Sequence, residues 1–125
     1  MSTNTKALLV MAHGSRAQKA NDEFKTIVNQ LSEYVSGYKI VEPIFLELCD
    51  PSMLDAVEVL YENGIENIDI YPMFFNQGKH VGVDIPAQIQ ECLTAYPNCT
   101  ITQLDYFGSN SEFAKIMAKH IESQG

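Results

Sequence analysis

Apolar residues along the chain alternate between short continuous runs and stretches with helical spacing. The first continuous run, Ala7–Ala12, is typical of a strand that is buried on both faces of a sheet. Apolar positions then recur at intervals of three and four residues from Ala20 to Val35, which predicts an amphipathic helix. The pattern of a strand followed by a helix occurs four times along the chain.

The three later units repeat this pattern. Strands are predicted at Ile40–Leu48, Ile68–Phe75 and Thr100–Phe107. Each is followed by apolar residues at helical spacing: Met53, Leu54, Val57, Leu60 and Tyr61, then Ile85, Ile89, Cys92, Leu93 and Tyr96, then Phe113, Ile116, Met117 and Ile121. Asp84 is expected to cap the third helix, and Ser109 with Glu112 has the spacing of a capping box before the fourth.

Alternating strands and helices with short connections predict an α/β fold, in which a four-stranded parallel sheet carries helices on both faces. Because crossover connections are right-handed, few topologies remain, and we expect the strand order 2-1-3-4. Ligands of such sheets bind beyond the carboxyl ends of the strands, at the switch point between strands 1 and 3. A length of 125 residues fits one domain, so residues 1–125 are expected to form a single unit.

Charge limits the partners that the chain can bind, and cysteine content indicates its cellular compartment. The net charge of −8 repels phosphates and anionic lipids, so we expect neither a nucleic acid nor a membrane as a partner. No apolar run approaches the ~20 residues of a membrane helix, and the first residues lack the pattern of a signal peptide. Cys49, Cys92 and Cys99 are odd in number and form no Cys-x-x-Cys pair, which favours reduced thiols in a cytoplasmic protein.

Side chains that can bind metal ions or transfer protons follow three of the predicted strands. His13 comes directly after the first strand, Glu47 lies at the end of the second, and His80 follows the third. Neighbouring strands lie about 4.8 Å apart, so the ends of strands 2, 1 and 3 span only about 10 Å. These three side chains can therefore converge on one small ion or ring.

Each of these residues has a structural interpretation as well as a functional one. Neutral imidazole binds borderline divalent metals, and a carboxylate adds charge or accepts a proton. A single histidine at a strand end is more often a structural hydrogen-bonding group, and Glu47 could be a solvated residue at the rim. The predicted convergence of His13, Glu47 and His80 favours function. His120 continues the apolar stripe of the last helix, so packing or partial exposure explains it.

Several common sites are missing from the sequence. It contains no G-x-x-x-x-G-K-[ST] loop and no G-x-G-x-x-G after the first strand, so we expect neither nucleotide hydrolysis nor an organic cofactor. Ser15 lacks the G-x-S-x-G setting of a hydrolase nucleophile. A phosphohistidine at His13 is a second enzymatic interpretation, but only Arg16 is placed to bind the phosphate.

Six segments in a fixed order resemble the small form of the CbiX family of class II chelatases, the sirohydrochlorin cobaltochelatases. The resemblance extends from Leu8 to about Gly108. Its segments are His13-Gly14-Ser15-Arg16, Val41-Glu42-Pro43-Ile44-Phe45-Leu46-Glu47, Pro51-Ser52-Met53-Leu54, Pro72-Met73-Phe74-Phe75, Gly78-Lys79-His80-Val81 and Asp84-Ile85-Pro86.

The resemblance implies a chelatase-like half-domain that inserts a divalent metal into sirohydrochlorin without ATP, on the route to cobalamin or a related tetrapyrrole. Cobalt is the expected metal, with nickel and iron as alternatives, and the metal is a substrate. The resemblance assigns His13, His80 and Glu47 as catalytic residues and metal ligands. It also implies a homodimer, because longer relatives contain two such domains facing each other.

Substrate-binding residues are expected around the histidines. Arg16 and Lys79 carry positive charge suited to the carboxylates of sirohydrochlorin, and Phe75 and Val81 are candidates for contact with the ring. Two departures, the polar pair Asn76-Gln77 and the lack of a His-Pro pair after Gly108, leave the exact tetrapyrrole open. A non-catalytic carrier of metal or tetrapyrrole would need the same ligands and remains an alternative.

Overall fold

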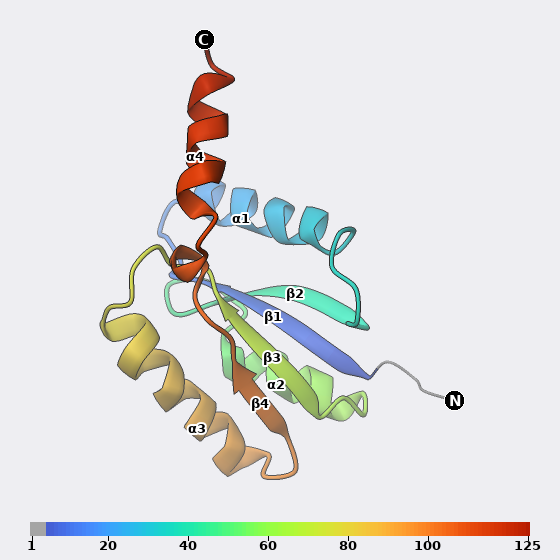
Figure 1. Ribbon diagram of the computed structural model, residues 1–125. Helices are drawn as coiled ribbons and strands as arrows, with labels where there is room; N and C mark the ends of the chain where they lie inside the picture. The colour runs from blue at the N-terminus through green and yellow to red at the C-terminus, as the bar shows by residue number, and fades with distance from the viewer. Residues whose placement is uncertain (1–4) are drawn as a thin grey trace.

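A computed structural model describes residues 5–125 and contains the expected four-stranded parallel sheet (Figure 1). Its order is β2-β1-β3-β4, which confirms the predicted 2-1-3-4 arrangement. The strands are β1 (Lys6–Ala12), β2 (Ile40–Phe45), β3 (Asn67–Pro72) and β4 (Thr100–Gln103). The last three end three or four residues earlier than predicted, because the apolar residues that follow them belong to loops.

Four α-helices accompany the strands: α1 (Gln18–Leu31), α2 (Met53–Glu62), α3 (Ile85–Ala95) and α4 (Phe113–Glu122). A single π-helical turn, His80–Asp84, runs directly into α3, and a short 3₁₀ turn, Phe107–Ser109, precedes α4. Helices α2 and α3 cover one face of the sheet and α1 lies against the other, whereas α4 projects away from it (Figure 1). Within residues 5–125, no helix combines the length and apolar character that a membrane span needs.

Strand β1 is the centre of the core because both of its faces are covered. Ala7, Leu9 and Met11 point to the side of α2 and α3, and Leu8 and Val10 point to the side of α1. All five are at most 5% exposed, as the continuous apolar run predicted. The core therefore holds rigidly the strand that leads into His13.

Both helix caps predicted from the sequence are wrong. The π-helical turn runs directly into α3, so the backbone of Asp84 is already helical and α3 has no free N-terminus there. The Asp84 carboxylate accordingly makes no cap hydrogen bond. Ser109 donates its hydroxyl to the Tyr106 carbonyl inside the 3₁₀ turn. Asn110 instead supplies the side-chain oxygen before α4, where it accepts a hydrogen bond from the Glu112 backbone N–H at 2.9 Å.

Candidate active site

Three loops at the carboxyl ends of the strands form the candidate active site. His13 follows β1, Glu47 follows β2, and His80 opens the π-helical turn beyond β3. The rings of His13 and His80 lie with their centroids 4.9 Å apart and their planes at 64°. Parallel strands bring their carboxyl ends to one edge, so residues 67 positions apart in sequence become neighbours.

His13 contacts Glu47 through one ring nitrogen and the backbone through the other. Its Nε2 lies 2.9 Å from Glu47 Oε2, and its Nδ1 lies 3.0 Å from the carbonyl oxygen of Gly14. A carbonyl oxygen only accepts hydrogen bonds, so Nδ1 carries a proton and donates it. The other nitrogen, Nε2, is paired with the Glu47 carboxylate; a contact of 2.9 Å between these atoms needs a proton between them, so Nε2 must lose that proton before it can bind a metal ion.

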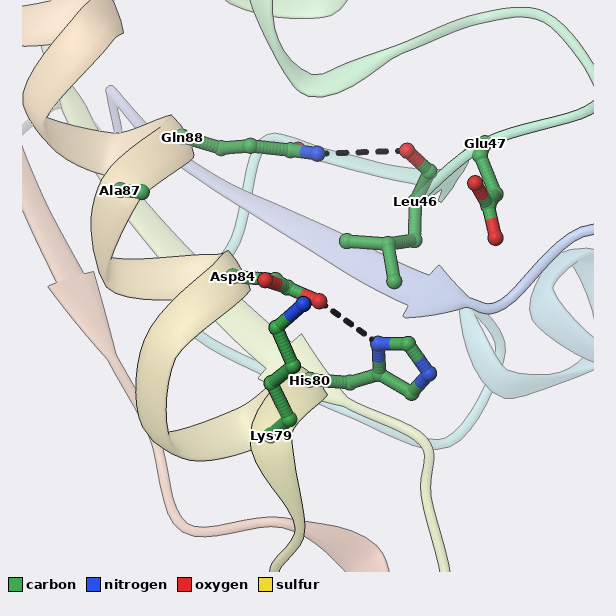
Figure 2. A pocket seen from close by; sticks show the side chains of 7 residues that line it. All are labelled: Leu46, Glu47, Lys79, His80, Asp84, Ala87 and Gln88. Atoms are coloured by element: carbon green, nitrogen blue, oxygen red, sulfur yellow. Dashed lines mark hydrogen bonds and ion pairs between the residues drawn. The ribbon is translucent and has the colours of Figure 1, made fainter.

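His80 is oriented by a carboxylate on its own helical turn. Its Nδ1 lies 2.8 Å from Asp84 Oδ2, a contact between residues four apart that Figure 2 shows at the start of α3. An ionised carboxylate only accepts, so Nδ1 is the donor and Nε2 is left with its lone pair. Carboxylates that hold a metal-binding imidazole in this way fix its tautomer and raise its basicity.

Backbone contacts hold the loops of His13 and Glu47 together. The Glu47 N–H donates to the His13 carbonyl at 3.0 Å. Gly14 has φ +98°, and a Cβ on it would lie 1.8 Å from the Glu47 carbonyl oxygen. Only glycine therefore allows this approach, which positions the Glu47 carboxylate against the imidazole.

A cleft of about 470 Å³ opens beside His80. Its lining comes from the β2 loop, the π-helical turn and α3, and consists of Leu46, Glu47, Lys79, His80, Asp84, Ala87 and Gln88 (Figure 2). The Gln88 amide donates to the Leu46 carbonyl at 3.2 Å, which ties α3 to the loop that carries Glu47. The Gln88 Oε1 atom is buried and has no hydrogen-bond partner among the described residues.

His80 also lines a second, apolar hollow of about 290 Å³, which is formed by the loop after β3. The Phe74 ring lies 6.0 Å from the His80 ring, and Phe75 is 62% exposed. His80 therefore adjoins both a cleft lined by polar and charged groups and a hollow lined by aromatic side chains.

The predicted substrate-binding residues occupy different environments. Lys79 lines the polar cleft and Phe75 lines the apolar hollow. Val81 is only 6% exposed, and it lines a separate hollow of about 350 Å³ together with Gln77 and Leu104. Arg16 is exposed on the loop before α1 and lines neither the cleft nor the hollow.

Sequence reasoning missed Asp84 and Gln88. Both have a helical spacing from His80, at four and eight residues, which was the available signal. The sequence predicts a helix cap at Asp84 because nothing in the residue pattern shows that helical structure begins before it.

The arrangement offers two imidazole Nε2 atoms and one carboxylate at the surface. Neutral imidazole suits cobalt, nickel, iron and zinc, and a carboxylate can join as a ligand or accept protons. Within residues 5–125, no three histidine, cysteine or acidic groups converge as a preformed metal cage.

Comparison with known proteins decides the family. The sequence profile of the CbiX family matches residues 7–124, nearly the whole chain. The chain belongs to the CbiX family. A relative in Arabidopsis thaliana, "Sirohydrochlorin ferrochelatase, chloroplastic", is 34% identical over 80 residues, which are 64% of this CbiX chain and 35% of that protein.

Two further relatives differ in length from each other. The "Sirohydrochlorin cobaltochelatase" of Sulfurisphaera tokodaii is 29% identical over 115 residues, which are 92% of this CbiX chain and 90% of that protein. The solved structure "SirB from Bacillus subtilis with Fe3+" has a TM-score of 0.86 and 27% identity, and the match covers 96% of this chain and 47% of that one. The CbiX chain thus spans half or less of the Arabidopsis and Bacillus proteins.

Proposed function

We propose that this CbiX-family chain inserts a divalent metal ion into sirohydrochlorin, as a metal chelatase that needs no ATP. The observation that carries the proposal is the pair of His13 and His80, whose rings lie 4.9 Å apart at the carboxyl ends of two neighbouring strands. The names of relatives support the substrate, since the Arabidopsis and Sulfurisphaera proteins are both called sirohydrochlorin chelatases.

Metal insertion exchanges one divalent ion for the two protons on the pyrrole nitrogens of the ring. In our proposal His13 and His80 bind the incoming ion through Nε2, because Nδ1 of each ring is already engaged with Gly14 and Asp84. Glu47 accepts one released proton, which its position 2.9 Å from His13 favours, and one of the two imidazoles accepts the other once the ion has moved into the ring. Two imidazoles and one carboxylate hold an ion less completely than a closed four-ligand site, which suits a metal that must be passed on.

The ring and its carboxylates are assigned to the two hollows beside His80. Lys79 and Arg16 are proposed to attract the carboxylates, and Lys79 is the better placed because it lines the cleft. Phe75 is proposed to contact the ring face, helped by Phe74 from the same loop. Val81 is proposed as a further contact for the ring, through the separate hollow that it lines.

We propose cobalt as the metal, with nickel and iron as competing ions. The Sulfurisphaera relative, which this chain matches over 90% of its length, is named a cobaltochelatase, whereas the longer Arabidopsis relative is named a ferrochelatase. Imidazole and carboxylate ligands do not by themselves select among these ions.

We further propose that residues 1–125 form one half-domain that acts as a homodimer in the cytoplasm. A four-stranded domain is small, whereas a tetrapyrrole is wide and flat, and a two-fold partner would supply an opposing wall. The match to about half of the Bacillus chain supports this arrangement. Reducing conditions agree with the free thiols of Cys49, Cys92 and Cys99.

The decisive experiment is anaerobic mixing of sirohydrochlorin with Co²⁺, followed by the absorbance change of the metallated ring. We expect His13→Ala and His80→Ala each to abolish most insertion and to weaken Co²⁺ binding. Glu47→Gln should slow turnover with a smaller loss of binding, because it keeps the shape but removes the proton acceptor. His120→Ala is the control, since it is exposed on α4, and should retain wild-type activity.

Two outcomes would overturn the proposal. If the wild-type protein binds both Co²⁺ and sirohydrochlorin without exceeding the uncatalysed rate, the chain is a carrier of metal or tetrapyrrole. If His120→Ala loses activity while His13→Ala keeps it, the assigned site is wrong.

A further inference from the structure

The peptide group that joins Leu46 to Glu47 is held from both sides. Its N–H, which belongs to Glu47, donates to the His13 carbonyl at 3.0 Å. Its C=O, which belongs to Leu46, accepts a hydrogen bond from Gln88 Nε2 at 3.2 Å (Figure 2). The N–H and C=O of a planar trans peptide point in opposite directions. The loop after β1 therefore holds one side of this peptide group, and α3 holds the other.

The orientation of this peptide group sets the direction of the Glu47 side chain. Leu46 is buried in the core on the side of α2 and α3, which fixes the chain before the peptide. Leu48, with φ +68°, is exposed, so the chain turns outward directly after Glu47. The Glu47 side chain is itself 55% exposed and contacts His13. The place of its carboxylate therefore depends on the backbone contacts more than on packing around the side chain.

The partner of Gln88 determines which way its amide points. A carbonyl oxygen only accepts hydrogen bonds, so the nitrogen of the amide and not its oxygen faces Leu46. A flipped amide would place Oε1 against another oxygen atom. In this orientation Oε1 is buried, and among residues 5–125 it has no hydrogen-bond donor.

Such an arrangement is unfavourable for folding. A buried amide oxygen without a donor destabilises the folded state, and an apolar side chain of similar length would avoid this loss. Gln88 also lines the same cleft as Glu47 and His80. Residues that lower stability beside a reactive site are typical of function, since activity and stability place different demands on the same positions.

Helix α3 connects the two sides of the candidate active site. His80 opens the π-helical turn that runs directly into α3, and its ring lies 4.9 Å from that of His13. Gln88 follows eight residues later, about two helical turns along, and reaches the loop that carries Glu47. One rigid element thus carries His80 at its start and holds the Glu47 peptide from its second turn.

We propose that Gln88 is a positioning residue for metal insertion, because its amide fixes the peptide plane that directs the Glu47 carboxylate to His13. Without this donor the peptide is held only on the side of His13, so its plane can rotate and the 2.9 Å contact between Glu47 and the His13 ring is lost. The inference rests on the chelatase function proposed above, in which Glu47 accepts a proton. Gln88 acts through Glu47 and touches no reacting atom.

Hydrogen exchange of the Glu47 amide, followed by NMR on the protein alone, provides the first test. Gln88→Met keeps an unbranched side chain without an N–H donor, and loss of one hydrogen bond should accelerate this exchange by about tenfold. Gln88→Glu keeps the shape, lacks the donor and should accelerate it as well. Gln90→Met is the matched control, because Gln90 is exposed on the same helix, and it should leave the exchange unchanged.

The melting temperature separates this role from a structural one. Gln88→Met removes the buried unpaired oxygen together with the hydrogen bond, so it should melt at the wild-type temperature or above. Its kcat for cobalt insertion should nevertheless fall by about 10–100-fold, with KM for sirohydrochlorin within about twofold of wild type. In a Glu47→Gln background, Gln88→Met should slow insertion by less than about threefold, because the carboxylate that it positions is already absent.

The alternative results separate this inference from the function on which it rests. Unchanged exchange of the Glu47 amide in Gln88→Met would overturn the inference, whatever the chelatase activity. Full additivity of Gln88→Met and Glu47→Gln, or a raised KM with an unchanged kcat, would also overturn it, because Gln88 would then act independently of Glu47. A wild-type protein that does not metallate sirohydrochlorin, but whose Glu47 amide responds to Gln88→Met, would overturn the proposed function and confirm the hold of Gln88 on the peptide.

Discussion

Replacing Gly14 with alanine tests whether the close approach of two loops holds the active site together. The new Cβ would lie 1.8 Å from the Glu47 carbonyl oxygen, whereas ordinary contacts begin at 3.4 Å. The loops must therefore separate by about 1.6 Å, the difference between these two distances. Since the same loops carry His13 and Glu47, their 2.9 Å contact cannot survive unchanged.

The size of the effect follows from two separate contributions. A left-handed backbone costs an L-residue about 1–2 kcal/mol, which applies to Gly14 with φ +98°. A misplacement of about 1 Å at a reacting centre costs roughly 100-fold in rate. We therefore expect Gly14→Ala to lose at least about 1 kcal/mol of unfolding free energy and about 100-fold in metal insertion.

Gly37→Ala is the matched control, because Gly37 has φ +90° and a Cβ there would meet no atom within 4 Å. Gly37→Ala should lose only the unfolding free energy that corresponds to the left-handed backbone, and it should keep its rate of metal insertion. Thermal unfolding and anaerobic cobalt insertion are measured on both variants. If Gly14→Ala inserts cobalt within about threefold of wild type, the contact between the loops of His13 and Glu47 does not position the reacting groups.

Three further predictions concern single side chains. Asp84→Asn should weaken Co²⁺ binding by about 10–100-fold with little change in melting temperature, because the His80 ring loses its anionic partner; an unchanged affinity in a cobalt titration would contradict this. Burial and a hydrogen bond to Asp69 raise the pKa of Tyr38 to about 12 from 10, so the stability it adds is complete below pH 10 and is lost as the pH rises towards 12. Tyr38→Phe should flatten that decline in denaturant titrations, and an equally steep decline would refute the assignment. Lys79→Glu should raise KM for sirohydrochlorin most at low salt, and a KM independent of salt and of the substitution would remove Lys79 from the binding surface.

The sheet and the convergence of its loops were predictable because they depend on local periodicity and connection handedness. The buried run Ala7–Ala12 could only be a central strand, and right-handed crossovers then fixed its neighbours. His13, Glu47 and His80 followed from their places after the strands. Strand ends were less predictable, since exposed apolar residues such as Phe75 and Leu48 continue the apolar pattern into the loops.

Other features depend on packing that no local pattern encodes. Asp84 has the sequence of a helix cap, and only the π-helical turn before it redirects its carboxylate to His80. The stripe of α4 was correctly placed at helical spacing, but the same spacing serves a helix packed on its own sheet and one that projects from it. The low exposure of Val81 was equally beyond the residue pattern, since a tight turn can point an apolar side chain inward as well as outward.

The attachment of the two histidines to neighbouring strands has a consequence for how the protein opens. His13 follows β1, which pairs with strands on both sides, and His80 follows β3, which does so as well. Glu47 follows β2, an edge strand. Central strands exchange their amide hydrogens only in openings close to global unfolding, whereas edges open at lower free energy. The two imidazoles that we propose as metal ligands therefore follow the strands whose amides should exchange most slowly. Glu47, the proposed proton acceptor, follows the strand that should open first.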